Sequence, residues 1–117
     1  PNLAGIVLGV NEKHNNVILG DVLPHPVGED FLSDTLCGLT FRLSVPSFYQ
    51  VNPAQTEVLY GKALEFAGLT GAETVLDLYC GIGTIGIAAS PEAKEVIGVE
   101  LNPDAVRDAV TNARSME

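Results

Sequence analysis

Residues 74–100 read TVLDLYCGIGTIGIAASPEAKEVIGVE, and this stretch decides the fold. It begins with a short run, Thr74 to Tyr79, that is apolar on both faces except at Asp77, which is typical of a buried parallel strand. A glycine-rich turn follows, then a compact helix of small residues, and then a second apolar run at 95–99. Strand, glycine turn, helix and strand in this order make up half of a nucleotide-binding crevice.

The glycines Gly81, Gly83 and Gly86 have the spacing G-x-G-x-x-G, and Glu100 follows at the distance of a dinucleotide fingerprint. Glycine permits the positive φ of such a turn and lets the backbone approach a ligand closely. The spacing alone favours NAD, but Asp77 beside the turn would repel a pyrophosphate. The ammonium and sulfonium groups of S-adenosylmethionine tolerate that carboxylate, whereas Glu100 can accept ribose hydroxyls from either ligand. A third interpretation is that the glycine turn binds no ligand and serves only the tight packing of the strand against the helix.

The composition limits the class of protein. With 117 residues, 46% of them hydrophobic and 18% charged, the chain fits one modest soluble domain. It has neither a run of about 20 apolar residues nor a signal peptide, so no membrane is involved and a cytoplasmic location is expected. The net charge of −9 makes the chain a poor electrostatic match for a phosphate backbone, so we do not expect it to supply the main binding surface for a nucleic acid. Cys37 and Cys80 lie far apart, so neither a disulfide framework nor a metal site built from paired cysteines is predicted.

The first 46 residues are predicted to be dominated by β structure. Apolar, β-branched runs at 6–10 and 17–20 indicate a hairpin with a long polar loop. Residues 21–34 have the prolines and glycine of a loop. Residues 39–45 alternate apolar and polar side chains, as a half-buried antiparallel strand does.

After Pro46 the pattern becomes helical. Asn52 can cap a helix that starts at Pro53, Gln55 occupies the capping-box position, and Gly68 ends the pattern. The predicted apolar stripe of this helix consists of Val58, Leu59, Ala63, Leu64, Phe66 and Ala67. A last helix begins after Asn102, with the stripe Ala105, Val106, Ala109, Val110 and Ala113.

The order helix, strand, helix, strand, helix predicts the first part of an open, parallel, Rossmann-like α/β sheet. Two parallel strands cannot bury both faces of a sheet. We therefore expect the chain to be a fragment of a longer protein, truncated at Glu117. Its uncovered apolar face predicts self-association.

Three runs together resemble one known family: FYQVN at 48–52, DLYCGIGT at 77–84 and GVE at 98–100. They are similar to the RNA uridine-5 methyltransferases, which use S-adenosylmethionine to make 5-methyluridine in ribosomal and transfer RNA. The resemblance covers most of the chain. It implies that residues 1–46 are the end of the family's β-rich central domain, and that residues 47–117 are the N-terminal part of its Rossmann-like methyltransferase domain.

The resemblance also implies a set of residues that bind S-adenosylmethionine: Gln50, Asp77, Tyr79, Gly81, Gly83, Thr84 and Glu100. Gln50 would contact the cofactor from the domain junction, and Glu100 would hold its ribose. Tyr79 and the two glycines would line the methionine side, Thr84 would occupy another contacting position, and Asp77 would shape the turn.

In this family a cysteine thiolate adds to the uracil ring, the neighbouring carbon takes the methyl group, and a carboxylate then removes a proton. Those residues lie beyond position 117, so the resemblance assigns no catalytic residue to this chain and implies that it is inactive alone. Cys80 matches the family's turn cysteine, and Asp77 would disfavour its thiolate. Cys37 is not expected to bind the iron–sulfur cluster of the members that have one.

Three alternatives to an RNA methyltransferase remain open at this point. The chain could bind S-adenosylmethionine for a non-RNA substrate, which the run at 48–52 disfavours. It could belong to an NAD-linked oxidoreductase. It could also be a β-domain interaction module without catalysis.

Overall fold

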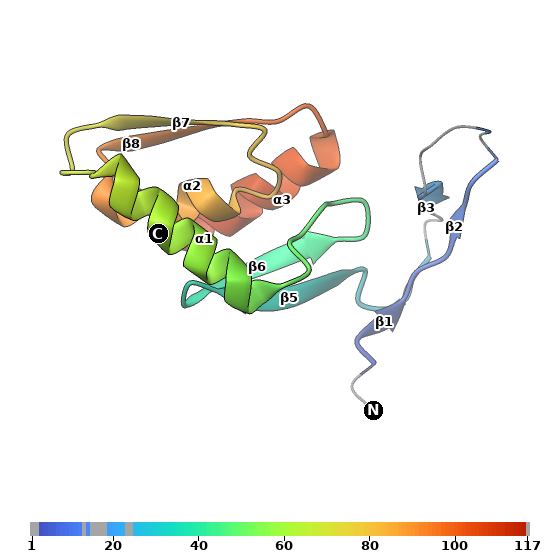
Figure 1. The fold of residues 1–117 in the computed structure, drawn as a ribbon. Coiled ribbons are helices and arrows are strands. Elements are labelled where there is room, and N and C mark those ends of the chain that lie inside the picture. Colours follow the sequence, from blue (N-terminus) through green and yellow to red (C-terminus); the bar gives the residue numbers. More distant parts are fainter. Residues whose placement is uncertain (1–2, 13, 15–18, 23–24, 117) are drawn as a thin grey trace.

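The computed structural model describes residues 3–12, 14, 19–22 and 25–116. The chain begins with short antiparallel strands: β1 (Gly5–Ile6) pairs with β4 (Val27–Gly28), and β2 (Gly9–Val10) pairs with β3 (Asp21–Val22). They form an arm that projects away from the helices (Figure 1).

The predicted hairpin at 6–20 is antiparallel as expected, but its second strand is displaced. β2 pairs with Asp21 and Val22, which lie in the segment predicted to be a loop. Residues 19 and 20 belong to no strand, and residues 17 and 18 of the predicted strand lie outside the described residues.

The next two strands, β5 (Phe31–Leu36) and β6 (Leu39–Ser44), form a regular antiparallel hairpin. Its two turn residues, Cys37 and Gly38, have φ values of 53° and 74°, the left-handed pair that a type I′ turn requires. The prediction of β6 is confirmed, whereas the prediction of a loop over 21–34 is wrong. Ser33 and Asp34 interrupt the apolar pattern of β5, so the strand depends on its pairing with β6 more than on its own sequence.

Helix α1 (Pro53–Ala67) starts and ends as predicted. The Gln55 N–H donates to Asn52 Oδ1 at 3.2 Å, and Gly68 ends the helix with a φ of 56°. The buried face differs from the predicted stripe, because Thr56 and Tyr60 are buried whereas three members of the stripe are exposed: Val58, Leu59 and Phe66.

The remaining elements are β7 (Thr74–Leu78), α2 (Thr84–Ala89), the short 3-10 helix η1 (Ser90–Glu92), β8 (Glu95–Val99) and α3 (Pro103–Arg114). β7 and β8 are parallel, with Leu78 opposite Val99. The predicted alternation of helices and strands and the α/β fold class are therefore confirmed.

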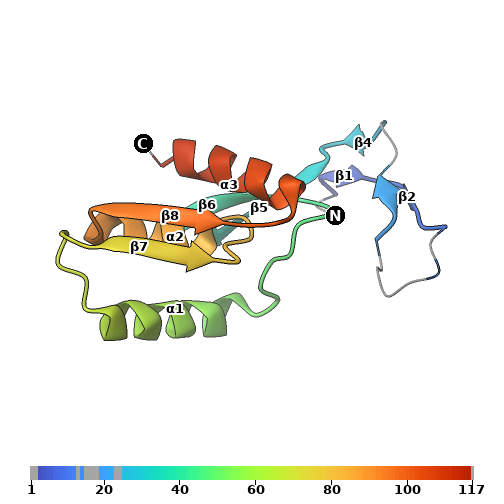
Figure 2. The same ribbon diagram turned by 90° about the horizontal axis from the view of Figure 1, so that it is seen from above.

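Helices α1, α2 and α3 lie on one side of the β7–β8 ribbon, with the β5–β6 hairpin beyond them (Figures 1 and 2). No described element covers the other face of the ribbon. Four apolar side chains on the two strands are 45–56% exposed: Leu76, Leu78, Ile97 and Val99. Self-association through this face stays a prediction.

The core joins the hairpin to the α/β part of the chain. Its buried members are Leu36 from β5, Phe41 from β6, Tyr60 from α1, Ile82 from the glycine turn and Ala105 from α3. Hence β5 and β6 pack with elements that follow residue 46, and the domain boundary placed there stays a prediction. Within the described ranges, no helix has both the length and the apolar character needed to cross a bilayer.

Candidate cofactor-binding site

The carboxyl ends of β7 and β8 lie side by side, which brings the glycine turn next to the residues that follow β8. The N–H groups of Tyr79 and Cys80 both donate to the Val99 carbonyl, at 2.8 and 3.0 Å. Ligands of open α/β sheets bind at this edge, outside the carboxyl ends of the strands.

The glycine turn has three residues in the left-handed region. Tyr79, Gly81 and Gly83 have φ values of 70°, 55° and 85°, and the Gly83 N–H closes the turn on the Cys80 carbonyl at 2.8 Å. Tyr79 is the exception among them, because a side chain larger than glycine's is strained there. It is also 90% exposed, so its ring is available to a ligand.

Glu100 fastens the turn to the end of β8. Its Oε2 accepts the Gly81 N–H at 2.9 Å, and its Oε1 accepts the N–H groups of Leu101 and Asn102, both at 2.8 Å. The Asn102 and Gly81 donors lower the pKa of the Glu100 carboxyl group. A carboxylate offers about four acceptor positions, so one position on Oε2 remains for a further donor such as a ribose hydroxyl.

Asp77 faces inward under the first turn of α2. Its Oδ2 is buried and has no hydrogen-bond partner. A Cβ added at Gly86 would lie 3.1 Å from that oxygen, so glycine leaves the space that the carboxylate occupies. Burial raises the pKa of Asp77, and the Gly86 N–H offsets this in part without completing a hydrogen bond to Oδ2.

Both cysteines are held in the thiol form. Burial raises the pKa of Cys80, and the negative charges of Asp77 and Glu100 raise it further, as predicted for Asp77. Burial and the charge of Glu57 also raise the pKa of Cys37, whose N–H donates to Glu57 Oε1 at 2.8 Å. Neither thiol is activated as a nucleophile.

Thr84 is the first residue of α2, and its hydroxyl is engaged within the protein. It lies 2.7 Å from the hydroxyl of Tyr60, and a hydroxyl can still accept a further bond. Gln50 is exposed in a separate cleft of about 560 Å³, which Leu43 and Tyr49 also line.

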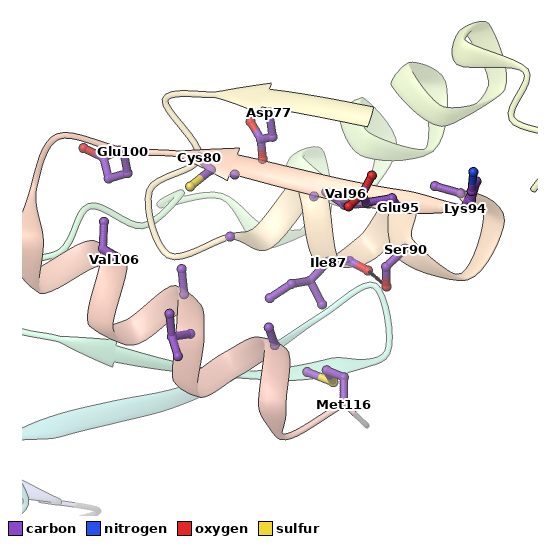
Figure 3. A pocket seen from close by; sticks show the side chains of 17 residues that line it. Asp77, Cys80, Ile87, Ser90, Lys94, Glu95, Val96, Glu100, Val106 and Met116 are labelled. Atoms are coloured by element: carbon purple, nitrogen blue, oxygen red, sulfur yellow. Dashed lines mark hydrogen bonds between the residues drawn. The ribbon is translucent and has the colours of Figure 1, made fainter. Parts of the chain in front are cut away.

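A second cleft, of about 470 Å³, gathers Asp77, Gly83 and Glu100 (Figure 3). In Figure 3, Glu100 lies at one end of this cleft and Lys94 at the other. The structure therefore brings these three predicted residues together, and Gly81 joins them through its hydrogen bond to Glu100. It leaves Gln50 in the other cleft, and Tyr79 and Thr84 border the turn.

Sequence reasoning missed Asn112, which contacts the glycine turn from α3. Its Nδ2 donates to the Ile82 carbonyl at 3.1 Å. Asp108 and Asn112 are buried with Ala105, whereas Val106 and Val110 of the predicted stripe are 38% and 45% exposed. The spacing of residues 105, 108 and 112 places them on one face of the helix, but two of the three are polar, so the pattern does not indicate a buried face.

No family model matches the chain, but individual proteins do. It is 54% identical over 114 residues to an uncharacterized RNA methyltransferase of Halalkalibacterium halodurans, a match that covers 97% of this chain and 25% of that protein. An uncharacterized RNA methyltransferase of Staphylococcus aureus is 51% identical with the same coverages. The chain thus spans about a quarter of the length of these curated relatives.

Solved structures agree with these relatives. The Pyrococcus abyssi tRNA (uracil-54, C5)-methyltransferase, in complex with S-adenosyl-L-homocysteine, has a TM-score of 0.81 and 29% identity over 98% of this chain and 28% of that one. Trm5b from the same organism has a TM-score of 0.68 at 18% identity over 98% of this chain and 34% of its own, and shows likeness of fold alone. The predicted resemblance is therefore confirmed: over nearly all its length, the chain is similar to RNA methyltransferases and has the α/β fold of the corresponding part of an S-adenosylmethionine-dependent methyltransferase.

Proposed function

We propose that this chain forms the S-adenosylmethionine-binding part of an RNA uracil-5-methyltransferase. The observation that carries the proposal is the likeness, over 98% of the chain, to a tRNA uracil-5-methyltransferase in complex with S-adenosyl-L-homocysteine. The substrate of the whole protein is then a uridine in ribosomal or transfer RNA.

The residues at the glycine turn fit this cofactor. A sulfonium and an ammonium group carry positive charge, and Asp77 places a carboxylate without a hydrogen-bond partner at Oδ2 beside the turn. Glu100 keeps one acceptor position for a ribose hydroxyl. The residues proposed to hold the cofactor are Gln50, Asp77, Tyr79, Gly81, Gly83, Thr84 and Glu100.

When bound, S-adenosylmethionine supplies an electrophilic methyl group. The chain's own residues bind and orient it: Glu100 fixes the ribose, and the turn at Gly81 and Gly83 lets the backbone approach the methionine side. Gln50 would reach the cofactor from the domain junction, which is proposed at residue 46.

We assign the thiolate that adds to uracil to neither cysteine of this chain, because the pKa of both Cys37 and Cys80 is raised. The same two residues are not proposed to hold an iron–sulfur cluster. With a net charge of −9, the chain also leaves the main electrostatic contacts with RNA to other surfaces of the protein. A cytoplasmic location suits this substrate.

Isothermal titration with S-adenosylhomocysteine and, separately, with NADH tests the proposal. We expect binding of S-adenosylhomocysteine and none of NADH. Binding of NADH alone would support the oxidoreductase alternative. If neither ligand binds, the remaining interpretation is an interaction module without catalysis. Transfer of a tritiated methyl group to RNA by the whole protein, compared with transfer to RNA whose uridines already carry a 5-methyl group, then tests the substrate.

We also propose that the chain pairs with a second copy through the exposed face of β7 and β8, which carries Leu76, Leu78, Ile97 and Val99. Light scattering over a range of concentrations should give a mass that rises above that of one chain. Leu76→Lys should restore the mass of one chain, and a wild-type mass that stays monomeric would contradict this.

A further inference from the structure

Asn112 connects three parts of the molecule through one buried side chain, which is 1% exposed. Its Oδ1 accepts the Arg42 N–H of β6 at 2.7 Å, and its Nδ2 donates to the Arg42 carbonyl at 3.1 Å. The same Nδ2 donates to the Ile82 carbonyl, also at 3.1 Å. Helix α3, strand β6 and the glycine turn therefore meet at this amide.

The contact at Ile82 fixes a peptide plane inside the turn. The Ile82 side chain is 2% exposed and packs in the core with Phe41, so the residue is held both by its side chain and by its carbonyl. The next N–H, that of Gly83, is engaged with the Cys80 carbonyl. Rotation of the peptide between Ile82 and Gly83 would break both bonds.

The turn is also held by Glu100, which accepts the Gly81 N–H. Two side chains from different parts of the chain thus hold adjacent residues of the turn, Gly81 and Ile82. Glu100 belongs to the site proposed above, whereas Asn112 is buried behind the turn, where no ligand can touch it.

We propose that Asn112 is a positioning residue for the methyl donor: it sets the Ile82 carbonyl and so orients the turn that holds the cofactor. The inference rests on the proposed function. It implies that the β5–β6 hairpin influences cofactor affinity, because Asn112 is itself held by both backbone groups of Arg42.

Asp108, one turn earlier on α3, provides a matched control. It is buried, and its Oδ2 accepts the N–H of Ser44 at 2.8 Å, the hydroxyl of Ser44 at 2.6 Å and that of Ser47 at 2.8 Å. It therefore fastens α3 to the same strand as Asn112 does, but its bonds do not include the turn. If Asn112 only docked α3 on β6, substitutions of Asn112 and of Asp108 should have the same effect on cofactor affinity.

The test compares Asn112→Asp with Asp108→Asn in the protein. Asn112→Asp keeps the acceptor for the Arg42 N–H and removes the N–H groups that donate to the Ile82 and Arg42 carbonyls. We expect its dissociation constant for S-adenosylhomocysteine to rise about tenfold, and that of Asp108→Asn to change less than about twofold. Titrations are made at a temperature at which thermal melts show both variants folded. Equal affinities for the two variants would overturn the proposal.

Nuclear magnetic resonance provides a readout that a merely structural role would not change. Asn112→Asp should shift the amide resonances of Gly81 and Gly83, and Asp108→Asn should leave them in place. In the wild type, which carries no folding risk, saturating S-adenosylhomocysteine should shift the side-chain amide resonances of Asn112. An Asn112 amide that does not respond would refute the inference.

The two proposals fail in different ways. If the wild type binds no S-adenosylhomocysteine, the proposed function fails, while the shifts of Gly81 and Gly83 in Asn112→Asp still report whether Asn112 orients the turn. If the wild type binds and Asn112→Asp binds equally well, only the positioning role fails.

Discussion

Asp77→Asn should stabilise the protein at neutral pH and, at the same time, weaken its binding of S-adenosylmethionine. The Oδ2 atom of Asp77 is buried without a hydrogen-bond partner, and burial raises the pKa of the group. A buried polar atom without a partner costs about 1–3 kcal/mol. An amide of nearly the same shape removes the buried charge but still leaves a polar atom without a partner, and Asp77 as a whole is only half-buried, so we expect a gain at the lower end of that range, about 1 kcal/mol.

The pH dependence has a definite sign. The folded-state pKa of Asp77 lies above that of the unfolded chain, so the folded protein binds more protons between the two values. The stability that this group contributes is present below the unfolded-state pKa and is lost as the pH rises through the folded-state pKa. The advantage of Asp77→Asn should therefore be absent below about pH 4 and grow as the pH rises.

Urea denaturation at a series of pH values measures this difference, and isothermal titration measures the affinity. We expect S-adenosylhomocysteine, whose ammonium would face the same carboxylate in the proposed site, to bind the variant about tenfold more weakly. Asp30→Asn is the control, because Asp30 is 59% exposed and pairs with Arg42 at the surface, where an ion pair contributes little. A variant that is less stable than the wild type at neutral pH, or a gain that is independent of pH, would refute the reasoning.

Two further predictions concern the same site. Gly86→Ala should lower the free energy of unfolding by about 1 kcal/mol in chemical denaturation, because its Cβ would lie 3.1 Å from both Asp77 Oδ2 and Val96 Cγ1. Gly61→Ala, with open space around the new Cβ, should instead stabilise the protein; a stabilising Gly86→Ala would contradict the packing. Glu100→Gln should destabilise the protein above about pH 5, and the difference should vanish as falling pH protonates the wild-type carboxylate, whose pKa is lowered. Thermal melts at several pH values measure it, and a difference that persists in acid would contradict the assignment.

The sequence predicts those features that depend on neighbours in the chain. Asn52 and Gly68 mark the ends of α1 because a cap and a left-handed residue act within one helical turn. The parallel strands and the glycine turn follow in the same way from residues 74–100. Asp77 and Glu100 could be placed beside the turn because the carboxyl ends of adjacent parallel strands share one edge.

Features that depend on distant partners could not be predicted. Asp108 and Asn112 are polar side chains that can be buried because they bond to Ser44 and Arg42. These partners lie more than 60 positions earlier in the chain, so the sequence around α3 does not reveal them. The strand β5 likewise forms because β6 pairs with it. On α1, the buried side is fixed by the hairpin and α2, so that Tyr60 rather than the more apolar stripe faces inward.

Two departures from local rules lie at or beside the glycine turn. Tyr79 has a left-handed backbone, and Asp77 keeps a buried oxygen without a partner, each at a cost of about 1–3 kcal/mol. The ends of α1, by contrast, have the residues that their geometry favours. Strain persists only where the surroundings determine it, and here Glu100 and the buried Ile82 hold the turn. Because such strain is characteristic of ligand sites, it supports cofactor binding independently of any likeness to other proteins.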